Sequence, residues 1–172
     1  MRPMQRDPEP WRKLGETLAG HFTARTRRLL ASEFVLLDRD GAEIGRLEIH
    51  GTASAEFKAG DAEARIECVV RSGYRMRSHD NEFLTSTGDA TSPEITYLNH
   101  PYKARLSLLR NTAEAGPAEH KATIRTTIRI KGGLTNRNYE ASFEPGDENS
   151  LPVALFLLYR LVALRREAYR AG

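Results

Sequence analysis

The residues of this sequence best suited to binding chemistry are arginines and lysines that alternate with apolar residues. In "GYRMRS", Tyr74 and Met76 alternate with Arg75 and Arg77. Successive side chains of a strand point to opposite faces, so this alternation predicts strands with one apolar and one basic face. The guanidinium fork matches the geometry of phosphate. If their strands are neighbours, an anion-binding surface would comprise Arg75, Arg77, Lys103, Arg105, Arg125, Arg129 and Lys131.

A solvated exterior explains the same basic pattern, because the outward side chains of any half-buried strand must be polar. Glu63 and Glu67 alternate with apolar residues in "DAEARIECVV", so other strands carry the opposite charge. Both interpretations of the basic residues therefore stay open at this stage.

Catalytic and metal-binding patterns find little support. The five histidines, His21, His50, His79, His100 and His120, are scattered without the paired spacing of metal ligands. We find no glycine-rich phosphate loop and no nucleophile elbow. "DRDG" and "GDEN" contain carboxylates that suit weak calcium binding, but turn and helix-cap roles explain both. We therefore expect a protein that is not an enzyme and needs neither a cofactor nor a metal.

The composition indicates one ordinary globular domain. The chain has 172 residues, 40% hydrophobic residues, 28% charged residues and a net charge of +3. Its first residues, "MRPMQRDPEPWRKLG", contain no apolar signal region, so we expect a cytoplasmic protein. Cys68 is the single cysteine and lies in an apolar alternation, which predicts a buried strand residue.

The N-terminal region, residues 1–26, is predicted to be a helical extension. From Asp7 to about Arg28, Trp11, Leu14, Leu18 and Phe22 recur at spacings that share one helix face. We expect this amphipathic helix to dock on the domain with its basic face in water. A membrane-surface helix and a helix that recruits a protein partner are the alternatives.

Residues 27–172 are predicted to form a mainly β domain. The apolar period is two from Arg28 to about Phe143, and turn signals such as "DRDG" and Gly132-Gly133 separate nine to twelve short runs. So many short antiparallel strands would leave exposed edges unless the sheet closes. We therefore expect a large antiparallel sheet of nine to twelve strands that closes into a barrel. Tyr74, Tyr102, Tyr139 and Phe143 fall on its inner face, so they are unavailable for stacking on nucleic acid bases.

The last segment, residues 150–170, is predicted to be a helix that is buried on all sides. "LPVALFLLYRLVAL" is apolar on every side, whereas a helix that lies on a sheet needs one apolar stripe. It is also shorter than the roughly 20 apolar residues of a membrane span. The core positions of this helix include Leu155, Phe156, Leu158, Tyr159, Arg160 and Val162.

Arg160 is the charged residue inside this apolar helix. An unpaired buried charge is strongly unfavourable, so Arg160 requires a carboxylate partner or an opening at the end of the barrel. Glu140, Glu144 and Asp38 are the candidate partners, and the charged "RREAYR" that follows is expected to emerge into solvent.

The early strand–turn–strand "FVLLDRDGAEIGRLEI" and the closing helix "SLPVALFLLYRLVAL" resemble the tubby C-terminal superfamily, which includes tubby proteins, phospholipid scramblases and LURP-one-related proteins. In that fold a barrel of about twelve strands surrounds a central hydrophobic helix. The resemblance implies binding of anionic phospholipid, such as a phosphoinositide headgroup, by basic side chains on strands. The cysteine cluster and proline-rich segment of scramblases are absent from this sequence.

The sequence therefore favours a non-enzymatic tubby-like barrel that binds anionic phospholipid headgroups as a peripheral membrane protein. The alternative is a scaffold domain that recruits a protein through its N-terminal helix.

Overall fold

The computed structural model describes residues 8–27, 32–70, 73–118, 127–145, 147 and 150–171. These residues form two helices and twelve strands. The helices are α1 (Pro8–Leu18) and α2 (Ser150–Ala171). The strands are β1 (His21–Thr26), β2 (Glu33–Leu37), β3 (Glu43–His50), β4 (Ser54–Ala59), β5 (Ala62–Val70), β6 (Gly73–Ser78), β7 (Asn81–Asp89), β8 (Ser92–Tyr97), β9 (His100–Ser107), β10 (Thr112–Pro117), β11 (Ile128–Gly132) and β12 (Asn138–Ser142).

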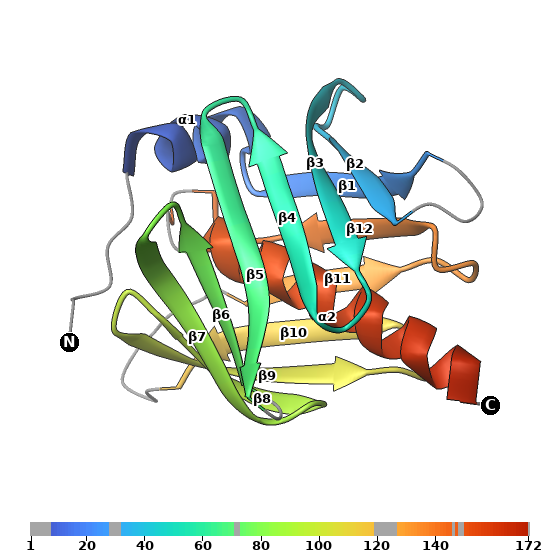
Figure 1. Cartoon of the computed structure of the whole chain (residues 1–172). Coiled ribbons are helices and arrows are strands. Elements are labelled where there is room, and N and C mark those ends of the chain that lie inside the picture. The colour runs from blue at the N-terminus through green and yellow to red at the C-terminus, as the bar shows by residue number, and fades with distance from the viewer. Residues whose placement is uncertain are drawn as a thin grey trace.

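The twelve described strands form a closed antiparallel barrel, as the alternation of apolar and polar residues predicts. Each strand pairs with its neighbours in the sequence, and β1 pairs with β12 to close the sheet (Figure 1). Closure removes the unpaired edges that a twelve-stranded sheet would otherwise expose. The expected mainly β fold is confirmed.

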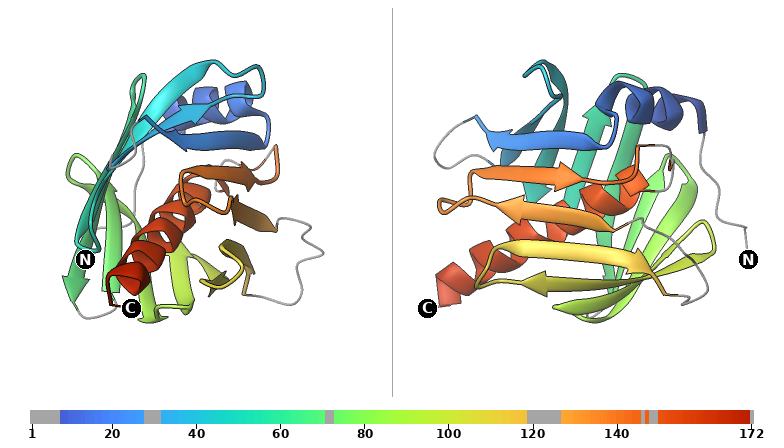
Figure 2. Two further views of the ribbon diagram at one scale, coloured as in Figure 1. Left: turned by 90° about the vertical axis from the view of Figure 1, so that its right-hand side faces the viewer. Right: turned by 180° about the vertical axis from the view of Figure 1, so that it is seen from behind.

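Helix α2 runs through the barrel, with strands on either side of it in both views of Figure 2. Every described residue from Ser150 to Ala163 is buried, and Leu155, Phe156, Leu158, Tyr159 and Val162 are fully so. Burial on all sides is the environment that an all-round apolar helix requires.

Small side chains make room for the helix inside the barrel. Alanines line the inner face of several strands, and α2 packs most extensively against β10, β11 and β12. Ala113 and Ala115 on β10 and Ala141 on β12 are almost completely buried there. Since an alanine projects only one methyl group, the helix can approach these strands closely.

The barrel has two different ends. At the capped end lie the β2–β3, β4–β5, β6–β7 and β8–β9 turns and the start of α2. Helix α1 covers this end, where Trp11 stacks on Phe57 at 5.4 Å between ring centroids and meets Phe83 edge-on at 5.9 Å. At the exit end, α2 leaves the barrel between the β3–β4, β7–β8, β9–β10 and β11–β12 turns (Figure 2, left).

Helix α1 is shorter than the periodicity predicts. It ends at Leu18, because Ala19 (φ 49°) and Gly20 (φ 84°) take the left-handed conformation that terminates a helix. A side chain at position 20 would also collide with the Phe143 carbonyl oxygen, 2.6 Å from an ideal Cβ. The chain then enters β1, so the barrel begins at His21, and the predicted boundary at residue 26 is wrong.

The apolar face of α1 packs on the barrel. Trp11, Leu14 and Leu18 are buried, and the contacts to Phe57 and Phe83 come from the chain's own strands. The apolar surface that a protein partner would need is therefore covered in this structure.

Cys68 does not occupy the predicted buried position. It is exposed near the end of β5, where it still pairs with Tyr74, and a bulge in the β5–β6 register follows it between Cys68 and Val70. A bulge reverses the side of the sheet on which the following residues lie. Val69 and Val70 are consequently exposed at the end of β5.

None of the described helices is long and apolar enough to cross a membrane.

The central helix allows a direct test of the architecture. Replacement of Leu158, which is fully buried, by alanine leaves a cavity and should lower the free energy of unfolding by about 2–5 kcal/mol. The matched change Leu134→Ala alters a side chain that is 99% exposed and should change it by less than about 0.5 kcal/mol. Urea denaturation followed by circular dichroism measures both variants. Equal effects of the two substitutions would contradict a central position for α2.

Candidate functional site

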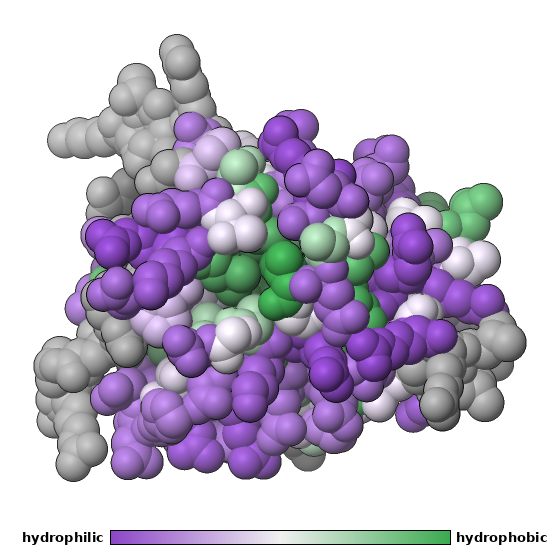
Figure 3. All heavy atoms as spheres, turned by 90° about the horizontal axis from the view of Figure 1, so that it is seen from above, coloured by the Kyte–Doolittle hydropathy of each residue, from purple (hydrophilic) through white to green (hydrophobic). Residues whose placement is uncertain are grey.

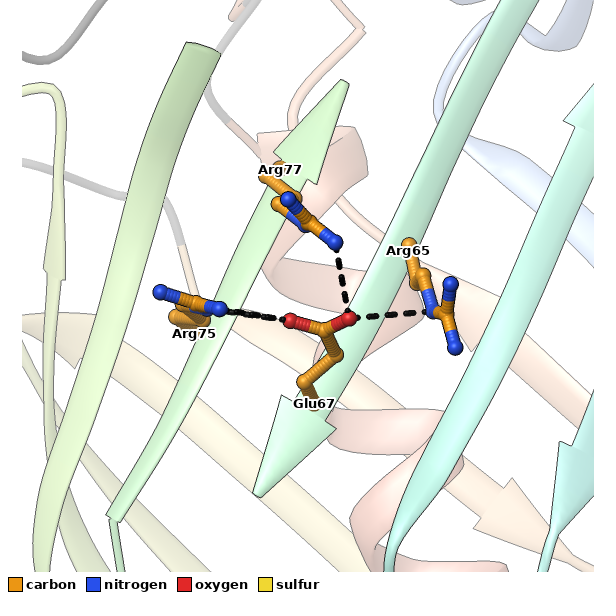
Figure 4. A network of polar contacts seen from close by, with 4 residues as sticks. All are labelled: Arg65, Glu67, Arg75 and Arg77. Carbon is orange, nitrogen blue, oxygen red and sulfur yellow. Dashed lines mark hydrogen bonds and ion pairs between the residues drawn. The ribbon is translucent and has the colours of Figure 1, made fainter. Parts of the chain in front are cut away.

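Four charged side chains on β5 and β6 form a compact cluster, in which one carboxylate lies among three guanidinium groups (Figure 4). Glu67 Oε1 lies 3.0 Å from Arg65 Nε and 3.0 Å from Arg77 Nη2. Its other oxygen, Oε2, accepts a hydrogen bond from Arg75 Nε at 3.0 Å. Two of the arginines predicted to bind an external anion therefore already share an anion of the protein itself.

The protonation of Glu67 follows from these contacts. Its side chain is only 17% exposed, and burial by itself would raise the pKa of the carboxyl group. The hydrogen bonds and positive charges of Arg75 and Arg77 outweigh burial and hold the pKa of Glu67 below its ordinary value. Glu67 is thus ionised at neutral pH and balances one of the three positive charges.

The other predicted basic residues face acidic residues on neighbouring strands. Lys103 on β9 pairs in register with Glu94, and Lys131 on β11 pairs with Glu140. Glu114 on β10 lies between Arg105 and Arg129, with its Oε1 3.5 Å from Arg129 Nε. Opposite charges in register stabilise adjacent strands and lower the net positive charge of the surface.

The predicted basic residues do not form one surface. Arg75 and Arg77 lie on β6, and β7 and β8 separate them from Lys103 and Arg105 on β9. Arg125 lies outside the described residues. The face seen from above, where α1 lies, is largely hydrophilic around a central apolar area (Figure 3). The described strand exterior therefore fits a solvated, charge-balanced surface better than a dedicated anion site.

The exit end of the barrel has a different character. Every large hydrophobic residue that is more than half exposed in the described part of the chain lies there. Leu109 (94% exposed) lies in the β9–β10 turn, and Leu134 (99% exposed) lies in the β11–β12 turn. The others are Val69 and Val70 at the end of β5 and Tyr169 near the end of α2.

Arginines accompany these exposed apolar side chains. Arg110 follows Leu109 in one turn, and Arg137 lies in the same turn as Leu134. Arg166 and Arg170 lie in the last two turns of α2, while Asp89 and Glu167 supply negative charge at the same end. The exit end therefore combines projecting apolar tips with basic residues beside them.

A network of polar side chains fixes the turns at the exit end. Arg165 Nε donates to Asn136 Oδ1 at 2.7 Å, and Arg165 Nη1 donates to the Leu108 carbonyl. Asn111 Nδ2 donates to the same Asn136 oxygen at 3.1 Å and to the Gly133 carbonyl at 2.9 Å. Leu109 and Leu134 thus project from turns that are tied both to each other and to α2.

Arg165 was expected to emerge into solvent, and this prediction is wrong. It is 8% exposed, because the turns that surround the end of α2 provide hydrogen-bond acceptors for its guanidinium group. The buried part of α2 therefore includes Arg165, the residue that follows its apolar run.

The partner of Arg160 also differs from the predicted carboxylates. Arg160 Nη1 donates to the hydroxyl oxygen of Tyr74 at 2.7 Å. Asp38 and Glu144 belong to the capped end, and Glu140 points outward from β12, so none of the three is available to Arg160. An opening at the barrel end, the other predicted possibility, lies beside Arg160.

One group of described side chains has the spacing of metal ligands. Potential ligand atoms of Glu48, His50 and Glu56, on β3 and β4, lie within 4.8 Å of one another. All three side chains are exposed, and a geometry of this kind is common without an ion. We assign them no metal-binding role.

The carboxylates of the turn sequences have structural partners. Asp38 Oδ1 accepts hydrogen bonds from the amides of Asp40 and Ala42, both at 2.9 Å. Asp147 Oδ2 accepts one from the Ser150 hydroxyl at 2.8 Å, at the start of α2. The contacts of "DRDG" and "GDEN" in the described residues are those of a turn and a helix cap.

The Glu67 cluster predicts a pH-dependent contribution to stability. Glu67→Gln leaves three mutually repelling arginines and should lower the free energy of unfolding by about 1–2 kcal/mol at pH 7. Because the pKa of Glu67 is lowered by folding, the carboxylate stabilises the protein above the ordinary glutamate pKa. The difference in the free energy of unfolding between wild type and Glu67→Gln should therefore shrink as the pH falls. The loss begins near the ordinary glutamate pKa and is complete below the lowered pKa of Glu67.

The control for this variant is Glu114→Gln, which removes a 58% exposed carboxylate 3.5 Å from Arg129. Its effect should stay below about 0.5 kcal/mol. Urea denaturation between pH 3 and pH 7, a range chosen to span roughly the carboxylate pKa values, measures both variants. A pH-independent effect of Glu67→Gln would contradict the ionised cluster.

Comparison with known proteins shows the fold and no more. No known family model matches this sequence, and no curated protein matches it. A solved structure of a protein from Arabidopsis thaliana is similar, with a TM-score of 0.57 and 10% sequence identity. The similarity covers 95% of this chain and 97% of the Arabidopsis chain. The whole described architecture therefore occurs in a solved structure, while membership of the tubby superfamily stays a prediction.

Proposed function

We propose that this protein docks reversibly on anionic phospholipid membranes through the exit end of its barrel. The observation that carries the proposal is the gathering of the most exposed hydrophobic side chains at that one end. Leu109 and Leu134 are almost fully exposed, so water surrounds apolar surface that a membrane interface would bury. Large exposed apolar side chains that gather at one place mark interaction sites.

The basic residues make an anionic membrane the best fit for this surface. Arg110, Arg137 and Arg170 are exposed at the same end of the barrel as the apolar tips, so they can attract lipid phosphates when the tips enter the interface. Each basic residue near an anionic membrane surface contributes about 1 kcal/mol of attraction. Apolar insertion and electrostatic attraction together give stable but reversible peripheral binding.

The rigid presentation of the tips favours this function. The hydrogen bonds among Asn111, Asn136 and Arg165 hold the two turns in place before any contact with a membrane. Preorganised turns lose little conformational freedom on binding.

This proposal replaces the strand exterior with the exit end as the lipid-binding surface. The strand arginines have acidic neighbours in register, whereas the exit end adds apolar tips to its arginines. The function is the one that the sequence predicts, and the residues assigned to it are different.

Vesicle co-sedimentation tests the proposal. Wild-type protein should bind vesicles that contain phosphatidylserine, bind less as salt is raised, and bind neutral vesicles weakly. The double variant Leu109→Asp, Leu134→Asp should lose affinity about tenfold or more, because two apolar insertions become two repelled charges. Both positions are exposed, so the fold should be unaffected.

The control is the double variant Arg105→Glu, Arg129→Glu on the strand exterior, which should bind phosphatidylserine vesicles within about threefold of wild type. If this control loses vesicle binding while the Leu109, Leu134 variant keeps it, the lipid-binding site lies on the strand exterior and not at the exit end. No binding of the wild-type protein to any vesicle would reject membrane docking.

A further inference from the structure

The charge on Arg160 has no carboxylate partner among the described residues. Its side chain is 6% exposed on a helix that is otherwise apolar at this level. Its guanidinium group donates a hydrogen bond to Tyr74 and lies over two rings, with Cζ 4.0 Å from the Tyr74 centroid and 5.8 Å from that of Tyr159. A guanidinium group has five N–H donors, so the hydrogen bond to Tyr74 satisfies only one of them.

Tyr74 holds the guanidinium group in place without neutralising it. The Tyr74 hydroxyl donates to the Thr52 carbonyl at 2.8 Å and accepts a hydrogen bond from Arg160. It therefore acts both as a donor and as an acceptor. Burial raises the pKa of Tyr74 even with Arg160 beside it, and the phenol therefore stays uncharged at neutral pH. Tyr74 therefore fixes the guanidinium group of Arg160 without supplying a negative charge to balance it.

A pocket of about 280 Å³ opens beside Arg160 at the exit end of the barrel. Its lining includes Thr52, Tyr74, Ser86 and Arg160, all of which carry polar groups, and Ser86 is only 3% exposed. Ser86 and Arg160 are buried donors beside this open space, and a guanidinium group without a carboxylate partner next to a hydroxyl group provides the chemistry of an anion site.

The lining of the pocket also contains two carboxylates. Asp89, at the end of β7, and Glu167, on α2, are exposed residues, whereas Arg160 is buried. Among the described residues, the contacts of Arg160 are with tyrosines and not with either carboxylate. A ligand that fits this arrangement has an anionic group for the buried arginine and a cationic group for the exposed carboxylates.

We infer that the Arg160 pocket binds a phosphate ester that carries an ammonium group, the chemistry of an ethanolamine or serine phosphate. The phosphate oxygens accept hydrogen bonds from Arg160 and Ser86, and the ammonium group lies near Asp89 and Glu167. A polyphosphorylated inositol fits poorly, because its additional charges would meet the two carboxylates. The same chemistry occurs in a soluble metabolite and in a lipid headgroup.

The inference deepens the proposed function and rests on it where the ligand is carried by a lipid. The pocket and the apolar tips share the exit end, so a docked barrel would present the pocket to headgroups. Binding of a soluble phosphate ester needs no membrane. The pocket and membrane docking can therefore be tested independently of each other.

Titration with O-phosphoethanolamine, followed by amide chemical shifts in NMR spectra, tests the pocket. Saturable shifts should be confined to the neighbourhood of Thr52, Tyr74, Ser86 and Arg160. Inorganic phosphate should bind about tenfold more weakly, because it lacks the ammonium group, and inositol trisphosphate should bind no better than inorganic phosphate. The absence of saturable shifts, or equal binding of O-phosphoethanolamine and inorganic phosphate, would overturn the inference.

Two sets of variants assign the residues. Arg160→Gln should weaken O-phosphoethanolamine binding about tenfold or more, and its fold is checked by its amide spectrum. The double variant Asp89→Asn, Glu167→Gln changes exposed positions, so it remains folded and tests the pocket even if Arg160→Gln does not fold. It should lose the preference for O-phosphoethanolamine over inorganic phosphate, and an unchanged preference would overturn the assigned roles.

Vesicles distinguish the two sources of ligand and the two proposals. Leu109→Asp, Leu134→Asp should lose vesicle binding and keep the response to O-phosphoethanolamine. If the ligand is a lipid headgroup, wild type should prefer phosphatidylethanolamine vesicles to phosphatidylcholine vesicles of equal surface charge, because the bulky trimethylammonium group of choline fits the pocket less well. The Asp89, Glu167 variant should lose this preference. If wild type lacks this preference but binds O-phosphoethanolamine, the ligand is the soluble phosphate ester.

Discussion

The structure depends on one physical constraint, the need of an apolar helix for contacts on all of its sides. A sheet laid against α2 would bury one stripe and leave the rest in water. The closed barrel surrounds the helix, and alanines such as Ala113 and Ala141 let strands approach it. Helix and barrel therefore require each other, because a twelve-stranded barrel without α2 would enclose a large empty interior.

This constraint limits where the protein can bind anything. The interior is filled by side chains, and α1 covers the capped end. Basic residues on the described strand exterior lie beside acidic ones, most tightly around Glu67. The exit end is therefore the described surface that is left for binding. The helix leaves the barrel there, beside Leu109, Leu134 and the Arg160 pocket.

Periodicity predicts the strands and the all-round burial of the last helix, because burial follows directly from the order of residues along each element. Closure of the sheet follows from the cost of unpaired edges, and the central position of the helix is implied by the resemblance to the tubby fold. Periodicity does not predict which charges meet across strands. The pairing of Glu67 with Arg75 depends on a register that the bulge near Cys68 helps to set. Prediction of the partner of Arg160 requires knowing which end of the barrel each turn occupies, and periodicity does not give this. Leu109 and Leu134 each lie beside polar residues in a turn. This pattern could have predicted exposed apolar side chains at these two turns.

The depth of the exit end in a bilayer tests the central functional claim most directly. With Cys68 replaced by serine, a spin label at position 134 can be compared with one at position 79, in the β6–β7 turn of the capped end. On phosphatidylserine vesicles, the label at 134 should become accessible to oxygen and protected from a water-soluble paramagnetic reagent, while the label at 79 stays in water. Equal water accessibility at both positions on protein that is bound to vesicles would contradict docking through the exit end.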